Sequence, residues 1–266
     1  VYQYAGVAMN SPSDPLPVKQ EIQQIYTILD APTSEVQEIL TGTSAGTVGG
    51  TFKISYKNEE SASITHGSTL EATIVNAITG LSTYNPPEGT PAIIVVETAV
   101  ANGGYKWTVQ FPSEVGDVEQ LVVSYASAGA TLTPSATVSA AVTTTTTGKA
   151  PLSGDFSVLY NGYAGLEETP HLRHDATALE MKRALENLEG VGVVDVSSSV
   201  YNTHGREWTV TFLTEVSDLP IMTTKSGRLG GSRPFAMVRE LQAGSQATLV
   251  YDGSTDPTTK TYTAID

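Results

Sequence analysis

Two stretches of this chain are written almost alike, and their spacing limits what the chain can fold into. "YKWTVQFPSEVGD" begins at Tyr105, and "REWTVTFLTEVSD" begins at Arg206. Each stretch holds one of the two tryptophans, and Trp107 and Trp208 lie 101 residues apart. The phenylalanine, glutamate and aspartate that follow each tryptophan keep the same spacing. A constant offset of this kind indicates that a unit of about 100 residues has been duplicated.

The first copy begins near Ser34 and predicts strands on both sides of one helix. Apolar and polar residues alternate with the period of a half-buried strand in several segments, namely "SEVQEILTG", "GGTFKISYKN", "AIIVVETA", "YKWTVQF" and "EQLVVSY". Between the second and third of these, "STLEATIVNAITGL" has apolar residues at helical spacing. Ser68 and Glu71 stand three residues apart at its start, the spacing of a capping box.

The second copy follows the same order. "AAVTTTTTG" is predicted to be its first strand, and "GDFSVLYNG" its second. "DATALEMKRALENL" predicts the helix, with Asp175 as its cap, and "VGVVDVSSS", "REWTVTF" and "LPIMTTK" predict the later strands. A third start, "MVRELQAGSQATLVYDG", repeats the opening and reaches Asp266 where the next helix is expected. Either the chain continues beyond this point, or a neighbouring chain supplies the missing half.

The predicted fold is α+β and mostly β. A helix with one apolar stripe covers one face of a sheet, so each unit is expected to be a small antiparallel sheet in the order ββαβββ under one helix. Trp107 and Trp208 are predicted to be core anchors. The expected domains are residues 1–33, an extended segment or the end of a preceding unit; 34–133, repeat 1; 134–236, repeat 2; and 237–266, an incomplete third repeat. Within the first segment, "EIQQIYT" resembles "EVQEILT" 14 residues later.

Composition excludes several classes of partner. The formal net charge of −14 disfavours nucleic acid and anionic lipid surfaces, which bind clustered Lys and Arg. There is no cysteine, so disulfides and thiolate metal sites are absent. No apolar run approaches the length of a membrane span.

A search for catalytic or metal-binding patterns gives only weak signals. His66 and His174 occupy equivalent places before the two helices, which indicates a feature of the repeat rather than a zinc site. The acidic pairs Glu114/Asp117 and Glu215/Asp218 fit polar turns better than a calcium loop. No nucleophile elbow, phosphate loop or HExxH helix is present. We therefore expect no enzyme, no cofactor and no metal.

Modification is a separate possibility, because the chain is rich in Ser and Thr. The candidate sites for O-linked sugar are Ser11, Ser13, Thr143, Thr144, Thr145, Thr146 and Thr147. The threonine run is also predicted to be a strand, and the two interpretations are compatible.

The unit written "GDFSVLYNG…HDATALEMKRALENLEGVGVVDVSSS…REWTVTFLTEVSDLPIM" resembles a repeat in very large extracellular proteins of protists and algae, with relatives in bacterial surface proteins. The resemblance covers about residues 34–250, and repeat 1 departs from it with "HGSTLEAT" in place of the "HDATA" segment. It implies an extended array outside the cell with no catalytic residues. Assembly into surface filaments such as flagellar hairs (mastigonemes) is one use that the resemblance suggests.

The sequence therefore predicts an extracellular structural protein on the cell or flagellar surface, which polymerises with copies of itself. Incomplete terminal units leave unpaired strands, and strand addition from a neighbour would satisfy them. The candidate residues of this subunit interface are Ile22, Ile25, Val238, Leu241, Leu249 and Tyr251. The alternative is an adhesive or glycan-binding module, which needs an exposed aromatic platform. Its candidate aromatic residues are Tyr84, Tyr163 and Tyr201, which are scattered in predicted loops.

Overall fold

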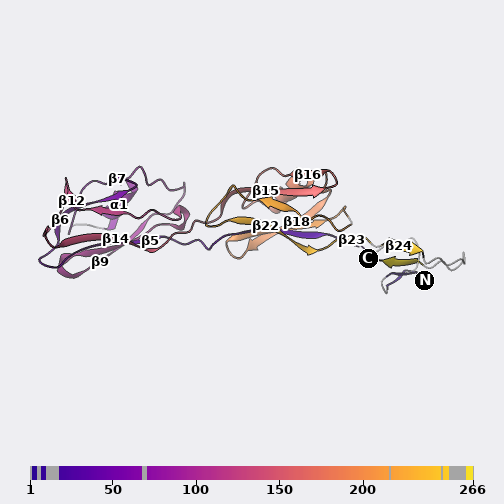
Figure 1. Ribbon diagram of the computed structural model, residues 1–266, viewed down its shortest axis with the longest axis horizontal. Coiled ribbons are helices and arrows are strands. Elements are labelled where there is room, and N and C mark those ends of the chain that lie inside the picture. Colours follow the sequence, from indigo (N-terminus) through magenta and orange to yellow (C-terminus); the bar gives the residue numbers. More distant parts are fainter. Residues whose placement is uncertain are drawn as a thin grey trace. The chain divides into compact units, whose positions relative to one another are not determined.

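The computed structural model describes residues 2–4, 7–9, 18–67, 71–215, 217–246, 248–251 and 262–265. Within them the chain is mostly β, with two α-helices and several antiparallel sheets (Figure 1). It divides into two compact units. Unit 2 comprises Asp30–Pro151 with Gly231–Arg233, and unit 1 comprises Val1–Leu29, Leu152–Gly230 and Pro234–Asp266. Unit 1 is therefore discontinuous in sequence, because unit 2 is inserted into it.

Unit 2 contains two sheets and one α-helix. Its elements are β5 (Val36–Thr43), β6 (Gly49–Tyr56), β7 (Glu59–Glu60), β8 (Ile64–Thr65), α1 (Glu71–Thr79), β9 (Ile94–Ala99), β10 (Tyr105–Gln110), β11 (Val122–Ser124), β12 (Ala126–Ser127), β13 (Ala130–Thr133) and β14 (Val138–Thr146). One sheet has the order β14-β5-β10-β9, and the other has the order β11-β6-β13-β12 with β7 and β8 also paired to β6.

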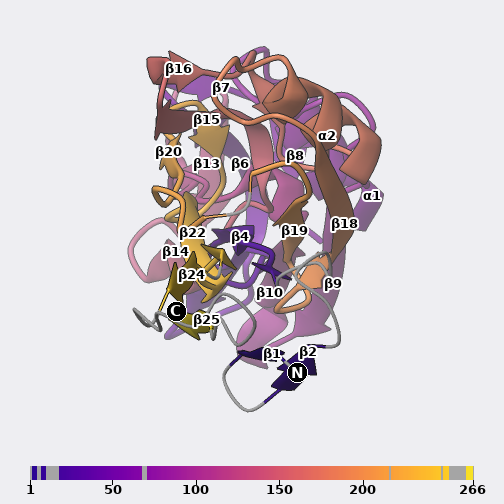
Figure 2. The same ribbon diagram turned by 90° about the vertical axis from the view of Figure 1, so that its right-hand side faces the viewer.

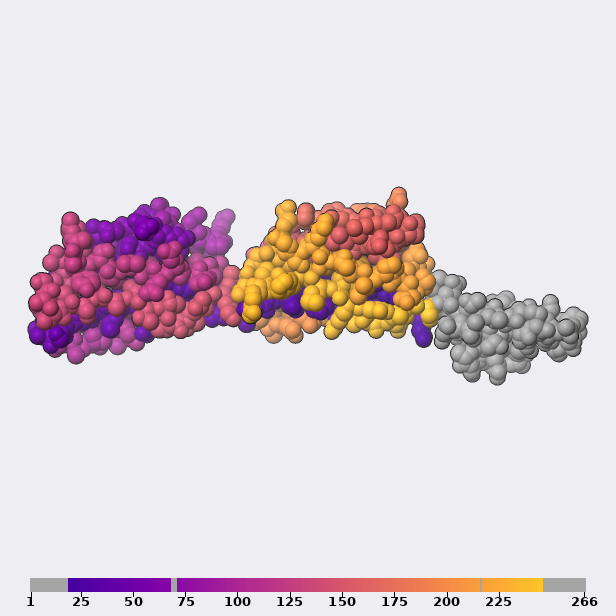
Figure 3. Space-filling model, in the orientation of Figure 1, coloured from indigo at the N-terminus to yellow at the C-terminus, as the bar shows by residue number. Residues whose placement is uncertain are grey.

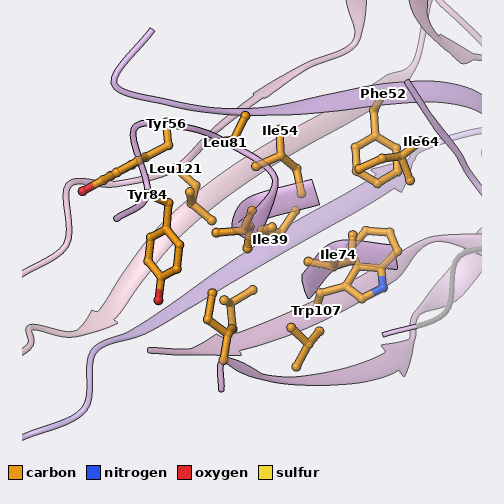
Figure 4. Close-up of a cluster of buried hydrophobic side chains, with 14 of the residues drawn as sticks. Ile39, Phe52, Ile54, Tyr56, Ile64, Ile74, Leu81, Tyr84, Trp107 and Leu121 are labelled. Atoms are coloured by element: carbon orange, nitrogen blue, oxygen red, sulfur yellow. The ribbon is translucent and has the colours of Figure 1, made fainter. Parts of the chain in front are cut away.

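The core of unit 2 lies between these two sheets (Figure 4). Phe52 from β6 and Trp107 from β10 meet with ring centroids 5.5 Å apart, and α1 inserts Ile74 and Ile78 beside them. Trp107 is fully buried, which confirms its predicted role as a core anchor. The expectation of one sheet under one helix is incomplete: the alternating strands face a second sheet, and α1 contacts both β6 and β9.

Unit 1 is built on the same plan. Its elements are β3 (Val18–Lys19), β4 (Ile22–Ile28), β15 (Ser153–Gly162), β16 (Gly165–Glu168), β17 (Leu172–Arg173), α2 (Ala178–Glu186), β18 (Val194–Tyr201), β19 (Gly205–Phe212), β20 (Thr223–Lys225), β21 (Leu229–Gly230), β22 (Phe235–Gln242) and β23 (Ser245–Gln246). One sheet has the order β18-β19-β4-β22, as Figure 2 shows, and β15 is the centre of the other. Trp208 is fully buried between them.

Strand β4 shows why unit 1 is discontinuous. It lies between β19 and β22, so that Trp208 and Val238 both pair with Ile25. Figure 3 shows the indigo atoms of this N-terminal strand among the orange and yellow atoms of the C-terminal half. The segment "EIQQIYT" is thus the first strand of unit 1, and the insertion of unit 2 separates it from the remaining strands.

The observed boundaries differ from those expected at residues 34, 134 and 237. Strand β14, expected to open the second repeat, pairs with β5 along its length and closes unit 2. Strand β22, expected to open a third repeat, pairs with β4 and closes unit 1. Both errors have one cause: the opening and closing strands pair with each other, and sequence similarity alone does not reveal partners.

A glutamate and a glutamine fix the first strand of unit 2. The Glu35 carboxylate is fully buried and accepts hydrogen bonds from the backbone N–H of Val118 (2.6 Å) and of Gly148 (3.2 Å). The Gln37 amide donates to the same carboxylate (2.7 Å) and accepts from the N–H of Leu121 (2.8 Å). We call this set of contacts the Glu-x-Gln anchor. It satisfies buried polar groups of two loops that have no strand partner.

Unit 1 carries the same anchor. Glu21 accepts from the backbone N–H of Gly244 (2.6 Å) and from the Gln23 amide (3.0 Å), and Gln23 accepts from the N–H of Met222 (2.8 Å). A Cβ added at Gly244 would lie 2.2 Å from the Ser217 backbone oxygen, so the close approach requires glycine. Gly148 is its counterpart in unit 2, with 2.0 Å to the Gly116 oxygen. The resemblance of "EIQQIYT" to "EVQEILT" therefore has a structural cause.

One of the two helices begins differently from its prediction. In α2 the cap is Thr177, whose hydroxyl accepts from the Glu180 N–H (3.2 Å), while the Glu180 carboxylate accepts from the Thr177 N–H (2.7 Å). The predicted cap, Asp175, instead pairs with Arg173 (2.8 Å). The capping box predicted at Ser68 lies outside the described residues, and α1 is described from Glu71 onward.

A further sheet joins the two ends of the chain. It contains β1 (Tyr2–Tyr4), β2 (Val7–Met9), β24 (Thr248–Tyr251) and β25 (Tyr262–Ile265), in the order β2-β1-β25-β24. Strand β1 pairs parallel with β25, whereas the other pairs are antiparallel. Residues expected in the extended N-terminal segment and in the incomplete third repeat thus share one sheet.

Candidate functional site

The predicted interface residues are distributed over two sheets. Ile25 is fully buried in the core of unit 1, and Val238 is half-buried against that core. Ile22 is half-buried at the start of β4, opposite Thr211. The strand pairing that we expected between subunits is, for β4 and β22, made within one chain. These three residues therefore help to form the sheet β18-β19-β4-β22 of unit 1.

The remaining predicted interface residues lie near the C-terminus. The Leu241 side chain is 48% exposed in β22, which is an edge strand of its sheet. Leu249 and Tyr251 lie in β24, and their side chains are outside the described part of the chain. Leu241 is therefore the one predicted interface residue whose described side chain is exposed.

The threonine run forms most of the second half of β14, as the strand interpretation predicts. Thr143, Thr145, Thr146 and Thr147 are exposed, and Thr144 is half-buried. The Thr145 hydroxyl donates to the Val36 backbone oxygen (3.2 Å). These positions are accessible to a modifying enzyme along one sheet edge. Ser11 and Ser13 lie outside the described residues.

The opposite edge of the same sheet is β9, and it has little protection against strand addition. Ile94 and Val96 point away from the core and are 56% and 51% exposed. The single charge of the strand, Glu97, accepts a hydrogen bond from the Trp107 indole N–H (2.7 Å), and its own backbone N–H donates to Glu71 (3.2 Å). The Ile94–Val96 part of β9 therefore presents apolar side chains beside an open row of backbone groups.

The two equivalent histidines have different environments. His66 is buried among Phe52, Tyr105 and Trp107, and its Nε2 lies 2.9 Å from the Thr41 hydroxyl. Burial lowers its pKa, although the nearby Glu97 opposes this effect. His174 is only half-buried, and its Nδ1 faces the Gly154 carbonyl at 3.2 Å. Within the described residues, neither histidine belongs to a cluster that can hold a metal.

Among the described residues, one acidic cluster has metal-ligand spacing: Glu21, Asp218 and Glu240. Glu21 is already occupied by its two anchor hydrogen bonds. Burial, reinforced by Glu21 and Asp218, raises the pKa of Glu240. Of the predicted acidic pairs, only Asp218 takes part in this cluster, and Glu21 was not expected to lie near it. The contacts of Glu21 identify its structural role in the anchor.

The three tyrosines considered for glycan binding lie in different environments and do not form one surface. Tyr84 is buried in the core of unit 2, so it is unavailable to a ligand. Tyr163 is 79% exposed and donates to the Glu189 carbonyl (2.6 Å). Tyr201 ends β18 and packs against Tyr26, with ring centroids 4.9 Å apart. Sequence analysis missed Tyr26 because its strand was assigned to an extended segment.

No helix in the described part of the chain has the length and apolar character needed to cross a membrane.

The chain matches no protein-family model and no curated protein. Among solved structures, it is similar to the flagellar cap protein FliD from Helicobacter pylori, with 16% identity and a TM-score of 0.21. That match covers 92% of this chain and 65% of the FliD chain. A TM-score this low supports no conclusion about fold or function.

Proposed function

We propose that this chain is an extracellular structural protein whose units are copies of one repeat, and that it assembles with copies of itself into a filament or sheath on the cell or flagellar surface. The resemblance to repeats of large surface proteins motivates the proposal. It assigns the chain no catalytic activity and no cofactor. The subunit contacts would be made by strand addition.

The observation that carries the proposal is the exposed edge of β9. Sheet edges in monomeric proteins are usually blocked by an outward charge, a proline or a bulge. The Ile94–Val96 part of β9 has none of these on its edge, whereas the neighbouring Glu97 N–H is bonded to the Glu71 carboxylate of α1 and the Glu97 carboxylate is held by Trp107. A strand paired there would place its own side chains beside Ile94 and Val96, and the unpaired backbone groups of the edge would gain hydrogen bonds.

A second observation supports strand exchange as the mode of assembly. Strand β4 is a central strand of the sheet β18-β19-β4-β22, although more than a hundred residues separate it from the next segment of unit 1. A sheet that accepts a strand from a distant segment of its own chain has the geometry to accept the equivalent strand of another subunit.

The proposal can be tested by adding one charge to the exposed edge of β9. Val96→Lys places an ammonium group on the edge strand β9, and a charged side chain, lysine above all, is the device by which natural sheets discourage strand addition at an edge. We expect the wild-type chain to form species larger than the 28.0 kDa monomer as its concentration rises, and the variant to remain monomeric. Sedimentation velocity and electron microscopy measure both results.

The matched control is Leu179→Lys, which replaces a similarly exposed apolar residue (53%) on helix α2. It should assemble as the wild type does. Assembly of Val96→Lys at wild-type concentrations would exclude the β9 edge as the contact. A wild-type chain that stays monomeric at every concentration would contradict self-assembly itself.

We also propose that the exposed threonines of β14 carry O-linked sugar in the native protein. Thr143, Thr145 and Thr146 are accessible on this edge strand, and the exposed Thr147 directly follows it. Mass spectrometry of peptides from native material should find hexose-bearing threonine within 143–147. Unmodified peptides throughout that range would remove this part of the proposal without affecting the β9 contact.

A further inference from the structure

The outer face of the sheet β18-β19-β4-β22 in unit 1 carries an aromatic patch that folding of the sheet does not require. The patch consists of Tyr26 on β4, Tyr201 on β18, and Phe235 and Met237 on β22. Met237 is the direct cross-strand partner of Tyr26, and the Tyr26 hydroxyl lies 3.9 Å from its sulfur. Phe235 and Met237 are 55% and 46% exposed.

A glycine brings the two tyrosine rings together. Tyr201 pairs with Gly205, which has no side chain to separate Tyr201 from the neighbouring strand. A Cβ at Gly205 would lie 2.0 Å from the Thr27 backbone oxygen, so no other residue fits there without movement. The Tyr201 ring reaches across this gap to Tyr26, and the two ring planes are tilted by 42°. The patch is therefore continuous across the four strands.

A line of polar groups runs beside the rings. The Arg239 guanidinium lies 5.4 Å from the centre of the Tyr26 ring, and its Nε donates to the Gln24 amide oxygen (2.7 Å). Gln24 donates to Glu207 (3.1 Å), which also accepts from the Ser199 hydroxyl (2.6 Å). Within the described residues, the terminal nitrogens of Arg239 make no hydrogen bond, so they remain available to a ligand.

Unit 2 is an internal control for this arrangement. Register places Leu40 at the position of Tyr26, Ala141 at that of Met237, and Ser139 at that of Phe235. A salt bridge between Lys106 and Glu38 (3.0 Å) stands where unit 1 has Glu207 and Gln24. The same sheet thus forms without aromatic rings on its outer face, so folding alone does not account for the patch.

We propose that the aromatic patch of unit 1 binds a neutral polysaccharide. The C–H faces of a pyranose ring carry partial positive charge and stack on the negative faces of aromatic rings, while its hydroxyl groups exchange hydrogen bonds with Arg, Gln and Glu side chains. The patch offers both groups side by side. The net charge of −14 disfavours a polyanionic chain.

The size of the patch argues against a second copy of the chain as its occupant. A stable protein interface buries about 800 Å² on each partner around an apolar core. Here the four apolar side chains of the patch occupy only two neighbouring rows of the sheet, Tyr201 and Phe235 in one and Tyr26 and Met237 in the other. Glu207 shares the row of Tyr26, and Gln24 and Arg239 form the next row, so polar groups border the patch directly. A small aromatic patch with polar groups along its border suits a sugar chain better.

Isothermal titration with cellohexaose, chitohexaose and mannohexaose tests the proposal on the full chain. We expect at least one of these to bind with a Kd tighter than about 1 mM, and Tyr201→Ala to weaken that binding roughly tenfold, the effect of one lost aromatic contact. Tyr201→Phe should retain it. Arg239→Ala should weaken it as well, because the free guanidinium nitrogens are lost.

Tyr163→Ala is the matched control, since it removes an exposed tyrosine of the same unit outside the patch. It should bind as the wild type does, and Trp208 fluorescence should show unit 1 folded in every variant. Failure of all three sugars to bind, or equal binding by Tyr201→Ala, overturns the proposal. Loss of self-association in Tyr201→Ala, in place of loss of sugar binding, would identify the patch as a subunit contact instead. The Val96→Lys experiment is independent of these outcomes.

Discussion

Unit 1 and unit 2 hold their sheets together with matching inward-facing side chains, yet their outer faces have little in common. Every second residue from the one before β4 points inward, namely Glu21, Gln23, Ile25 and Thr27. The residues at the same places in and before β5 are Glu35, Gln37, Ile39 and Thr41, and all eight are completely buried. Between them, the outward positions hold Gln24 and Tyr26 in one strand and Glu38 and Leu40 in the other. The comparison distinguishes the inward-facing residues, which the fold of both units requires, from the outward-facing residues, which the fold leaves free to vary.

The sequences of the two units are therefore most alike at the inward-facing positions, where each side chain makes a specific hydrogen bond or core contact. Each threonine bonds the backbone of the neighbouring strand, Thr27 to Arg206 and Thr41 to Tyr105. Each glutamate and glutamine accepts hydrogen bonds from loop N–H groups that have no other partner among the described residues. The aromatic patch and the β9 edge take no part in these shared contacts, and the two units differ there.

The largest expected effect comes from removing the strand that unit 1 receives from the N-terminal segment. Deletion of residues 1–29 removes β4, and without this central strand unit 1 should not fold. Because Trp208 reports on unit 1 and Trp107 on unit 2, fluorescence during urea unfolding should show loss of the Trp208 transition alone. Deletion of residues 1–17, which retains β4, should preserve it. A normal Trp208 transition in the longer deletion would refute the observed pairing.

Loss of the anchor carboxylate should destabilise each unit separately. In Glu35→Ala, the buried N–H groups of Val118 and Gly148 lose their acceptor, so the free energy of unfolding of unit 2 should fall by about 3 kcal/mol or more. Glu21→Ala should do the same to unit 1. The control, Glu38→Ala, breaks only a partly exposed salt bridge and should cost about 1 kcal/mol or less. Equal effects on both tryptophan transitions would contradict separate anchors.

A smaller effect is expected at the helix that has a described capping box. Thr177→Ala removes the hydroxyl that accepts from the Glu180 N–H and should destabilise unit 1 by about 1 kcal/mol. Thr223→Ala, an exposed threonine of β20, serves as the control. Urea midpoints from Trp208 fluorescence measure both variants, and equal midpoints would show that the cap contributes nothing.

The burial of His66 should affect stability in acid. Since burial lowers the folded-state pKa of His66 below its ordinary value of 6.5, the unfolded chain takes up a proton before the folded one does. The stability of unit 2 should therefore be complete above about pH 6.5 and decrease as pH falls below it. His66→Gln should reduce this dependence. An unchanged pH profile of the Trp107 transition in the variant would show that His66 is not its cause.

Sequence analysis located most strands and both helices because their patterns are local. The alternation of Phe52, Ile54 and Tyr56 places β6, and the similarity around Trp107 and Trp208 places β10 and β19. The cap of α2 was assigned two residues early, because Asp175 is also a good capping residue and only geometry shows that its carboxylate pairs with Arg173.

The candidate sites were harder to predict. The threonine run was placed correctly on a strand, but Ile25 and Val238 were assigned to a subunit interface although they pair within the chain. The aromatic patch was not predicted, since its members come from three strands that are far apart in sequence. Tyr26 and Met237 are brought together only by the register of β4 and β22.

The sequence by itself indicated two similar segments and located most of their strands, both helices and the two buried tryptophans, because the two-residue period of a strand and the repeated motifs are local properties. Tertiary structure alone decided which strand belongs to which unit. "EIQQIYT" and "EVQEILT" carry the same inward-facing glutamate, glutamine and threonine, so either suits the opening position of a sheet. Their partners are chosen by backbone hydrogen bonds and packing between distant segments, and no local pattern encodes that choice.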